Sequence, residues 1–105
     1  MEFLETDIFT KQIQAILTDQ EYSYLQASLI NKPNFGALIP GGKGLRKLRW
    51  SVKEKGKSGG ARIIYYWYVD DEQIYMLCAF KKTDQADLTK DQLKMLAQYV
   101  KKGVL

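Results

Sequence analysis

The chain has 105 residues, of which 46% are hydrophobic and 27% charged, and this predicts one ordered domain over residues 1–105. It contains no histidine and a single cysteine, Cys78, which excludes histidine-based nucleophiles and an intramolecular disulfide, and no metal or other cofactor is expected. Residues 41–67 hold eight lysines and arginines against one glutamate, a net of +7 in a chain of net charge +4, which predicts a surface that binds a polyanion.

The N-terminal third predicts two helices. Apolar residues recur at helical spacing over residues 6–17 and indicate a first amphipathic helix. Thr18 and Glu21 have the spacing of a capping box, so a second helix is expected to begin there. Pro33 ends that helix because proline disfavours a helical residue before it. The inner face of the second helix is expected to hold Tyr22, Leu25, Leu29 and Ile30.

Three strands are predicted after a loop over residues 34–44. The first, residues 45–50, alternates between two faces. One face carries Leu45, Lys47 and Arg49, and the other carries Arg46, Leu48 and Trp50. The second, residues 62–69, is rich in β-branched and aromatic residues and is typical of a central strand. The third, residues 74–80, follows an acidic turn, so the three strands predict an antiparallel meander.

The C-terminal segment predicts one more helix. Thr89 and Gln92 form a second capping signature, and the helix that follows has one apolar stripe. The stripe consists of Leu93, Leu96, Ala97 and Val100. The expected class is therefore α+β, with two N-terminal helices, an antiparallel sheet of three to five strands and a C-terminal helix. Neither a signal peptide nor a membrane-spanning stretch is evident, and a cytoplasmic protein is expected.

Three segments resemble a known group of toxins. They are residues 44–50, residues 56–67 and residues 80–89, which occur in the order typical of the RelE/ParE superfamily of type II toxins. The middle segment is most similar to the HigB-type branch, and the Asp-Leu-Thr pattern at residues 87–89 also resembles that branch. The resemblance implies a RelE-like fold, with a twisted antiparallel sheet that has helices on one side and a basic groove on the other.

The resemblance also implies a function and partners. It implies a toxin of a type II toxin–antitoxin system, an endoribonuclease that cleaves mRNA in the ribosomal A site and inhibits translation. The expected partners are the ribosome, mRNA and a cognate antitoxin of the HigA type with a helix-turn-helix domain, and no membrane. The alternative is a ParE-like toxin that inhibits DNA gyrase without cutting RNA.

Four residues match the basic residues that the resemblance assigns to catalysis: Lys47, Arg49, Arg62 and Lys82. Further basic residues are expected to bind RNA or the ribosome, namely Lys43, Arg46, Lys53, Lys55, Lys57 and Lys81. Leu88 falls near a position where RelE has a tyrosine, so a mechanism with tyrosine as the base is in doubt.

The residue types suit RNA cleavage by the substrate's own 2′-OH, which requires proton transfer and stabilisation of the charged phosphate. The planar guanidinium of Arg62 suits that phosphate. Lys47 lies among other cations, which disfavours its charged form, so it is the first candidate for proton transfer; Lys82 is the second, and Asp84 is a possible base.

Structural alternatives remain open for these residues. Lys47 and Arg49 can be plain solvent-face charges, and Arg62 can form an ion pair with an acid of the turn at residues 70–72. The aromatic residues 65–68 can be core or a base-stacking platform, and the loop at residues 53–60 can contact phosphates or be solvated turn. An antitoxin can cover the basic groove or bind elsewhere.

Overall fold

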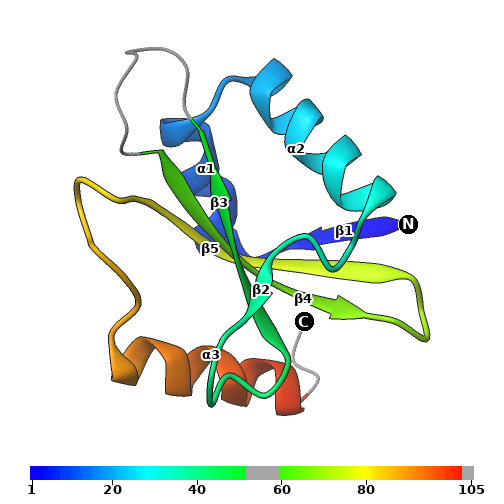
Figure 1. Ribbon diagram of the computed structural model, residues 1–105, viewed down its shortest axis with the longest axis vertical. Helices are drawn as coiled ribbons and strands as arrows, with labels where there is room; N and C mark the ends of the chain where they lie inside the picture. Colours follow the sequence, from blue (N-terminus) through cyan, green and yellow to red (C-terminus); the bar gives the residue numbers. More distant parts are fainter. Residues whose placement is uncertain (52–59, 103–105) are drawn as a thin grey trace.

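The computed structural model describes residues 1–51 and 60–102. It contains eight elements in chain order (Figure 1): β1 (Glu2–Glu5), α1 (Asp7–Ile16), α2 (Asp19–Asn31), β2 (Ala37–Leu38), β3 (Leu45–Trp50), β4 (Ala61–Tyr68), β5 (Gln73–Lys81) and α3 (Lys90–Lys102). The predicted α+β class, with two N-terminal helices and one C-terminal helix, is confirmed.

Both N-terminal helices begin at a threonine that caps them. Thr6 accepts a hydrogen bond from the backbone of Phe9 at the start of α1. At the start of α2, Thr18 Oγ1 accepts from the Glu21 backbone N–H (3.1 Å), while Glu21 Oε1 accepts from the Thr18 backbone N–H (2.8 Å). The predicted capping box is therefore confirmed. The inner face of α2 holds Leu25 and Leu29 as expected, but Ile30 was predicted wrongly, because its side chain is 55% exposed.

Replacing Thr18 with alanine is expected to lower the free energy of unfolding by about 1 kcal/mol, because the Glu21 backbone N–H in the first turn of α2 loses its acceptor. Urea unfolding followed by circular dichroism measures this change. Ser23→Ala, at an exposed position within α2, is the matched control and is expected to be neutral or slightly stabilising. Equal stability of Thr18→Ala and wild type would contradict the assigned role of the capping box.

The sheet has five strands in the order β1-β5-β4-β3-β2. Strands β3, β4 and β5 form the predicted antiparallel meander, with β4 in the centre. Strand β1 was not predicted and pairs parallel to β5, so the sheet is mixed rather than wholly antiparallel. The two-residue β2, which lies in the predicted loop, pairs with Lys47 and Arg46 only, so β3 forms the edge of the sheet beyond them.

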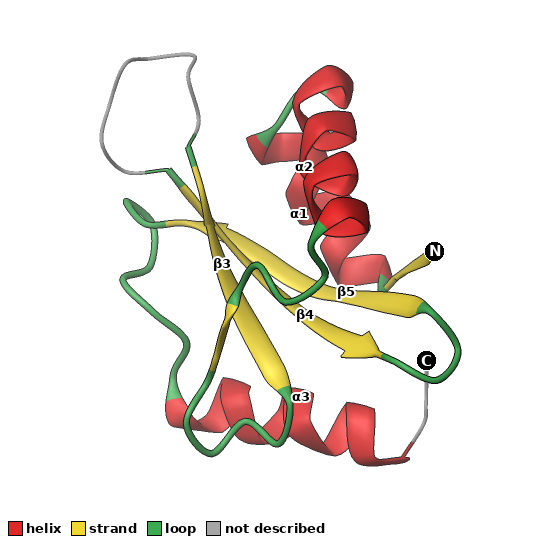
Figure 2. Ribbon diagram, turned by 45° about the vertical axis from the view of Figure 1, so that its right-hand side comes forward, coloured by secondary structure: helices red, strands yellow, loops and turns green. Residues whose placement is uncertain are grey.

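Helices cover both faces of this twisted sheet. Figure 2 shows α1 and α2 on one side and α3 on the other. The larger core lies on the α1/α2 face, where Phe9, Leu25 and Leu29 pack against strand residues such as Ile63 and Tyr65. The second core lies on the α3 face and contains Leu45, Leu77 and Ala97. The expectation that all helices lie on one side of the sheet is thus wrong, because the stripe of α3 has its own apolar partners on the opposite face.

Side chains of the N-terminal segment complete the edge of β5 where β1 ends. Thr6 Oγ1 donates to the carbonyl of Leu77 (2.9 Å), and Gln12 Oε1 accepts from the backbone N–H of Ala79 (2.8 Å). These bonds satisfy strand groups that would otherwise need another strand. The N-terminus and β5 are therefore held together by more than the four residue pairs of their ladder.

Candidate active site

The α3 face of the sheet carries three of the predicted basic residues in one group, which we call the basic row: Lys47, Arg49 and Arg62. Arg49 and Arg62 are directly paired across β3 and β4, and Lys47 pairs with Ile64 two residues along. Residues two apart on a strand share a face, so the predicted arrangement of Lys47 and Arg49 is confirmed. Two arginines directly opposite one another repel, and an anion bound between them offsets this repulsion.

Arg62 is held firmly in the row. Its side chain is only 8% exposed, and its Nη1 donates to the carbonyl of Ala61 (3.3 Å). The acidic turn at residues 70–72 lies beyond the other end of β4, roughly 25 Å along the strand from Arg62. The structural alternative of an ion pair with that turn is therefore wrong, and Arg62 lies on the α3 face of the sheet, opposite Arg49.

Asp87 joins the basic row from the segment between β5 and α3. Lys47 Nζ donates to both carboxylate oxygens of Asp87, at 3.0 and 2.9 Å, although the two residues lie 40 positions apart. The Lys47 side chain is 27% exposed and that of Asp87 58%. The ammonium of Lys47 donates both of these bonds, so it brings a positive charge into contact with the Asp87 carboxylate.

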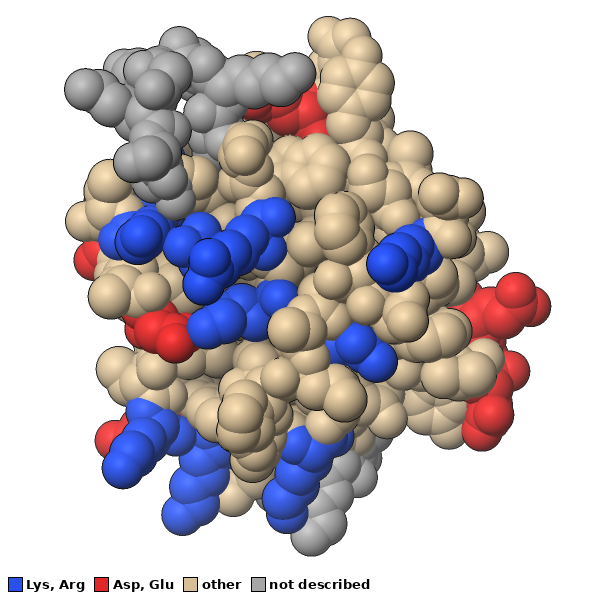
Figure 3. All heavy atoms as spheres, in the orientation of Figure 1, with Lys and Arg blue, Asp and Glu red and all other residues tan. Residues whose placement is uncertain are grey.

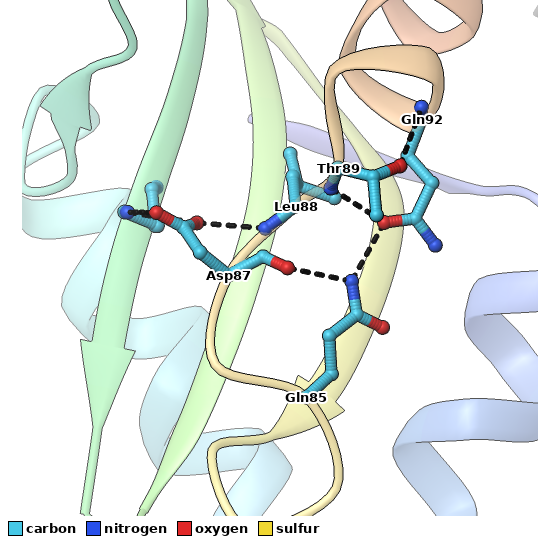
Figure 4. Close-up of polar contacts among 6 residues, drawn as sticks. Gln85, Asp87, Leu88, Thr89 and Gln92 are labelled. Atoms are coloured by element: carbon cyan, nitrogen blue, oxygen red, sulfur yellow. Dashed lines mark hydrogen bonds and ion pairs between the residues drawn. The ribbon is translucent and has the colours of Figure 1, made fainter.

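A network of hydrogen bonds fixes Asp87 (Figure 4). Its Oδ1 accepts from the backbone N–H of Leu88 (2.8 Å), and its carbonyl accepts from Nε2 of Gln85 (2.8 Å). The predicted capping signature of α3 is confirmed next to it, because Thr89 and Gln92 bond each other reciprocally (2.9 and 3.1 Å). The start of α3 therefore positions the carboxylate at the basic row.

The charge state of Asp87 follows from these contacts. The hydrogen bond from Lys47 holds the pKa of this carboxyl below its usual value of 3.8, the Leu88 N–H and the charge of Arg62 act in the same direction, and partial burial opposes them. At neutral pH, Asp87 is thus an ionised hydrogen-bond acceptor within the row.

Lys82 and Asp84 lie directly after β5. Lys82 follows β5, and its backbone N–H donates to the carbonyl of Gly60 (3.2 Å), next to the start of β4. Asp84 lies in the turn after β5, where its backbone N–H donates to the Lys81 carbonyl (3.0 Å). Both side chains are exposed. Among the described carboxylates, Asp87 rather than Asp84 contacts a member of the basic row.

The residues expected to bind RNA or the ribosome occupy several places. Arg46 lies on the α1/α2 face, where its Nη1 donates to the Gly36 carbonyl (2.8 Å), and the alternation of β5 puts Lys81 on the same face. Lys43 is exposed and lines a separate pocket with Lys90 and Lys94 of α3. Lys53, Lys55 and Lys57 lie outside the described residues. The basic residues therefore do not form a single site.

The space-filling view agrees with two basic areas on one side of the molecule. Figure 3 shows lysine and arginine side chains gathered near the middle of this face, next to an acidic patch, and a second group at its lower edge, where Figure 1 places α3. A polyanion that crosses this face can contact both areas.

Burial also decides the roles of Cys78 and of the aromatic residues of β4. Burial raises the pKa of the Cys78 thiol to about 12, so this cysteine is a structural residue and not a nucleophile. Tyr65 is fully buried, whereas Tyr66 and Tyr68 form a ring cluster with Tyr75 at the end of β4 remote from Arg62. The aromatic strand is therefore largely core, and its exposed end lies away from the basic row.

Within residues 1–51 and 60–102, no three Asp, Glu, Cys or His side chains lie close enough together to hold a metal ion. Among the helices described, none combines the length and the apolar character needed to cross a membrane.

Comparison with known proteins assigns the family. A model of the RelE toxin of the RelE/RelB toxin–antitoxin system matches residues 6–104. The chain belongs to the RelE toxin family. The fold is similar to a chain of the intact Escherichia coli RelBE toxin–antitoxin complex, with a TM-score of 0.56 at 12% sequence identity over 76% of this chain and 94% of that chain. At this identity the structural match supports the fold.

Asp87, which contacts Lys47 in the basic row, was not among the predicted site residues. The Asp-Leu-Thr pattern at residues 87–89 supports the family resemblance but predicts no role for its aspartate, and Asp84 is the carboxylate expected as a possible base. The available signal was that Asp87 lies two residues before the capping threonine of α3, so the helix start fixes its position. Leu88, next to it, is half-buried and lines an apolar pocket with Cys78 and Phe80, so it supplies no hydroxyl group there.

Replacing Asp87 with asparagine is expected to remove a pH-dependent part of the toxin's stability. The pKa of Asp87 is lower in the folded state, so its contribution is present above 3.8 and is lost as the pH falls through the folded value. The exposed pair contributes less than about 1 kcal/mol. Urea unfolding at about pH 6 is expected to show a less stable variant, and at about pH 3 a smaller difference. A difference that does not shrink at acid pH would contradict this assignment.

Proposed function

We propose that this toxin is a metal-independent endoribonuclease that cleaves mRNA in the ribosomal A site and thereby inhibits translation. The observation that carries the proposal is the basic row with its ionised partner: Lys47, Arg49 and Arg62 share one face of the sheet, and Asp87, just before α3, contacts Lys47. Family membership and the positive charge of residues 41–67 support the same activity.

The chemistry follows from the groups present. The 2′-oxygen of the substrate attacks the adjacent phosphorus as its proton leaves, the bond to the 5′-oxygen breaks, and that oxygen gains a proton; the products are a cyclic phosphate and a 5′-hydroxyl. Arg62 and Arg49 bind the phosphate and offset its developing charge. Asp87 accepts the 2′-OH proton, and Lys47 supplies the proton to the leaving oxygen, with Lys82 as the second candidate for that transfer.

The ribosome supplies what the toxin lacks. A carboxylate with a low pKa is a weak base, and the chain has no histidine to replace it. Slow intrinsic chemistry is compensated when the substrate is held in the reactive geometry, which can contribute several kcal/mol. We therefore assign the alignment of mRNA to the ribosomal A site, and we expect free RNA to be cut far more slowly than translated RNA.

The partner that neutralises this activity is proposed to be an antitoxin of the HigA type with a helix-turn-helix domain. The family is defined by a toxin–antitoxin system, which supports an antitoxin partner. An acidic or amphipathic segment that covers the basic row would block RNA binding directly, whereas binding elsewhere would keep the toxin from the ribosome. Both modes inhibit the same cytoplasmic step.

The test is a cleavage map on translated mRNA. Wild type and Lys47→Ala are induced in cells, and primer extension locates new 5′ ends in the coding region. Discrete cuts that weaken by about 10²-fold in Lys47→Ala are expected, because a proton-transfer group is lost. Growth arrest with intact mRNA and altered DNA supercoiling would overturn the proposal in favour of a ParE-like gyrase inhibitor.

A further inference from the structure

An open pocket borders the basic row at the edge of the sheet. It has a volume of about 510 Å³ and is lined by Glu21, Tyr24, Phe35, Arg49, Trp50 and Ser51. Strand β2 pairs only with Lys47 and Arg46, so no strand covers the edge of β3 at Arg49 and Trp50. Arg49 therefore belongs both to the pocket, which it lines, and to the basic row, where it faces Arg62 across the β3–β4 ladder.

The lining is aromatic and exposed. The Tyr24 side chain is 59% exposed and that of Phe35 47%, although large apolar groups are normally buried. Tyr24 comes from α2, Phe35 from the segment that follows it, and the half-buried Trp50 from β3. Aromatic side chains from three segments therefore line one surface pocket beside Arg49, the residue that the proposed function assigns to the phosphate.

We propose that this pocket binds an unpaired nucleobase of the RNA strand whose phosphate lies on Arg49 and Arg62. The inference rests on the proposed function and names a second contact for the same substrate. A base lies one sugar away from its phosphate, so a strand held at Arg49 places a neighbouring base at the pocket. Aromatic side chains stack on the bases of single-stranded RNA, and arginine adds a cation–π contact.

The charge of the pocket selects between possible occupants. Glu21 repels a phosphate or an acidic peptide, but a carboxylate accepts hydrogen bonds from the N–H groups on the edge of a base. One oxygen of Glu21 accepts the Thr18 N–H (2.8 Å), which fixes the side chain in place, and a carboxylate has capacity for further donors. A base with N–H donors fits a wall that holds both Glu21 and aromatic rings.

The test compares RNA with and without a base. The probes are single-stranded RNA tetranucleotides with 2′-O-methyl groups, which block cleavage, either intact or abasic at one position at a time. Wild-type toxin is expected to bind the intact strand about fivefold to a hundredfold more tightly than one of the abasic strands, from the usual contribution of one stacked base. Tyr24→Ala/Phe35→Ala is expected to lose this preference and to bind that abasic strand as wild type does.

Control variants separate a base contact from general effects. Tyr99→Ala removes an aromatic ring that is 40% exposed on α3, away from the pocket, and is expected to keep the preference. Tyr24→Phe/Phe35→Tyr keeps both rings and is expected to restore it. Equal binding of intact and abasic strands by wild type, or no measurable binding of either, would overturn the nucleobase pocket.

The same variants separate this inference from the proposed function. If the pocket instead receives an apolar side chain of the antitoxin, Tyr24→Ala/Phe35→Ala keeps the wild-type preference for a base and loses antitoxin affinity, which overturns the inference. In that case wild type still cuts translated mRNA. If wild type does not cut translated mRNA, the proposed function fails, whatever the oligonucleotides show.

Discussion

Replacing Arg62 with alanine is expected to lower mRNA cleavage by about 10²- to 10³-fold, the usual cost of removing a group that stabilises charge in a transition state. The guanidinium is nearly buried, lies opposite Arg49 and helps to lower the pKa of Asp87, so its removal takes a positive charge out of the basic row. Arg62→Lys keeps the charge but loses the planar fork, so an intermediate loss of at least about tenfold is expected.

The measurement is the yield of cleaved message in a translating extract at fixed toxin concentration. Lys11→Ala, on the exposed side of α1, removes one positive charge outside the site and is the matched control, with activity near wild type. Thermal unfolding of each variant shows whether it is folded. A folded Arg62→Ala toxin that cleaves as fast as wild type would remove Arg62 from the reaction.

Replacing Tyr65 with phenylalanine is expected to lower the free energy of unfolding by about 2 to 3 kcal/mol, a large share of the stability of a small domain. The Tyr65 hydroxyl is buried; it donates to the carbonyl of Pro33 (2.7 Å) and accepts the backbone N–H of Gly36 (2.8 Å). Burial raises the pKa of Tyr65, so the hydroxyl stays protonated and keeps its donor role. Phenylalanine fills the same space but leaves the buried Gly36 amide without this acceptor.

Differential scanning calorimetry measures the effect as a fall in Tm of roughly 10 to 20 °C. Tyr99→Phe, at a partly exposed position on α3, is the matched control and is expected to change Tm little. The two lost hydrogen bonds both belong to the segment after α2, which carries Phe35 and the Gly36 carbonyl that accepts from Arg46. A Tyr65→Phe variant as stable as wild type would show that these two bonds do not hold the segment in place.

Local signals in the sequence were sufficient for most of the fold. Thr18 with Glu21 and Thr89 with Gln92 mark helix starts because their bonds span only three residues, and β4 is recognisable from its run of β-branched and aromatic residues. Strand β1 was missed because its four residues carry glutamates at both ends and pair with a strand some seventy positions away. Such pairing is decided by tertiary contacts that local propensity does not contain.

Strand alternation and family resemblance predicted only part of the site. Alternation placed Lys47 and Arg49 on one face, and family resemblance added Arg62, whose position opposite Arg49 required the register of β3 against β4. Asp87 required the path of the chain from β5 to α3, which no periodicity describes. The position of Arg46 also follows from alternation, but its bond to the Gly36 carbonyl depends on where the segment after α2 passes.

The parallel pairing of β1 with β5 has a consequence for synthesis of the toxin. Thr6 bonds to Leu77, so the first strand has no partner until nearly all of the sheet has left the translating ribosome, and Asp87 and α3 follow later still. Contacts of such long sequence separation form slowly and late. A nascent chain therefore lacks a complete sheet until β5 has been synthesised, and it lacks Asp87 and α3 until still later.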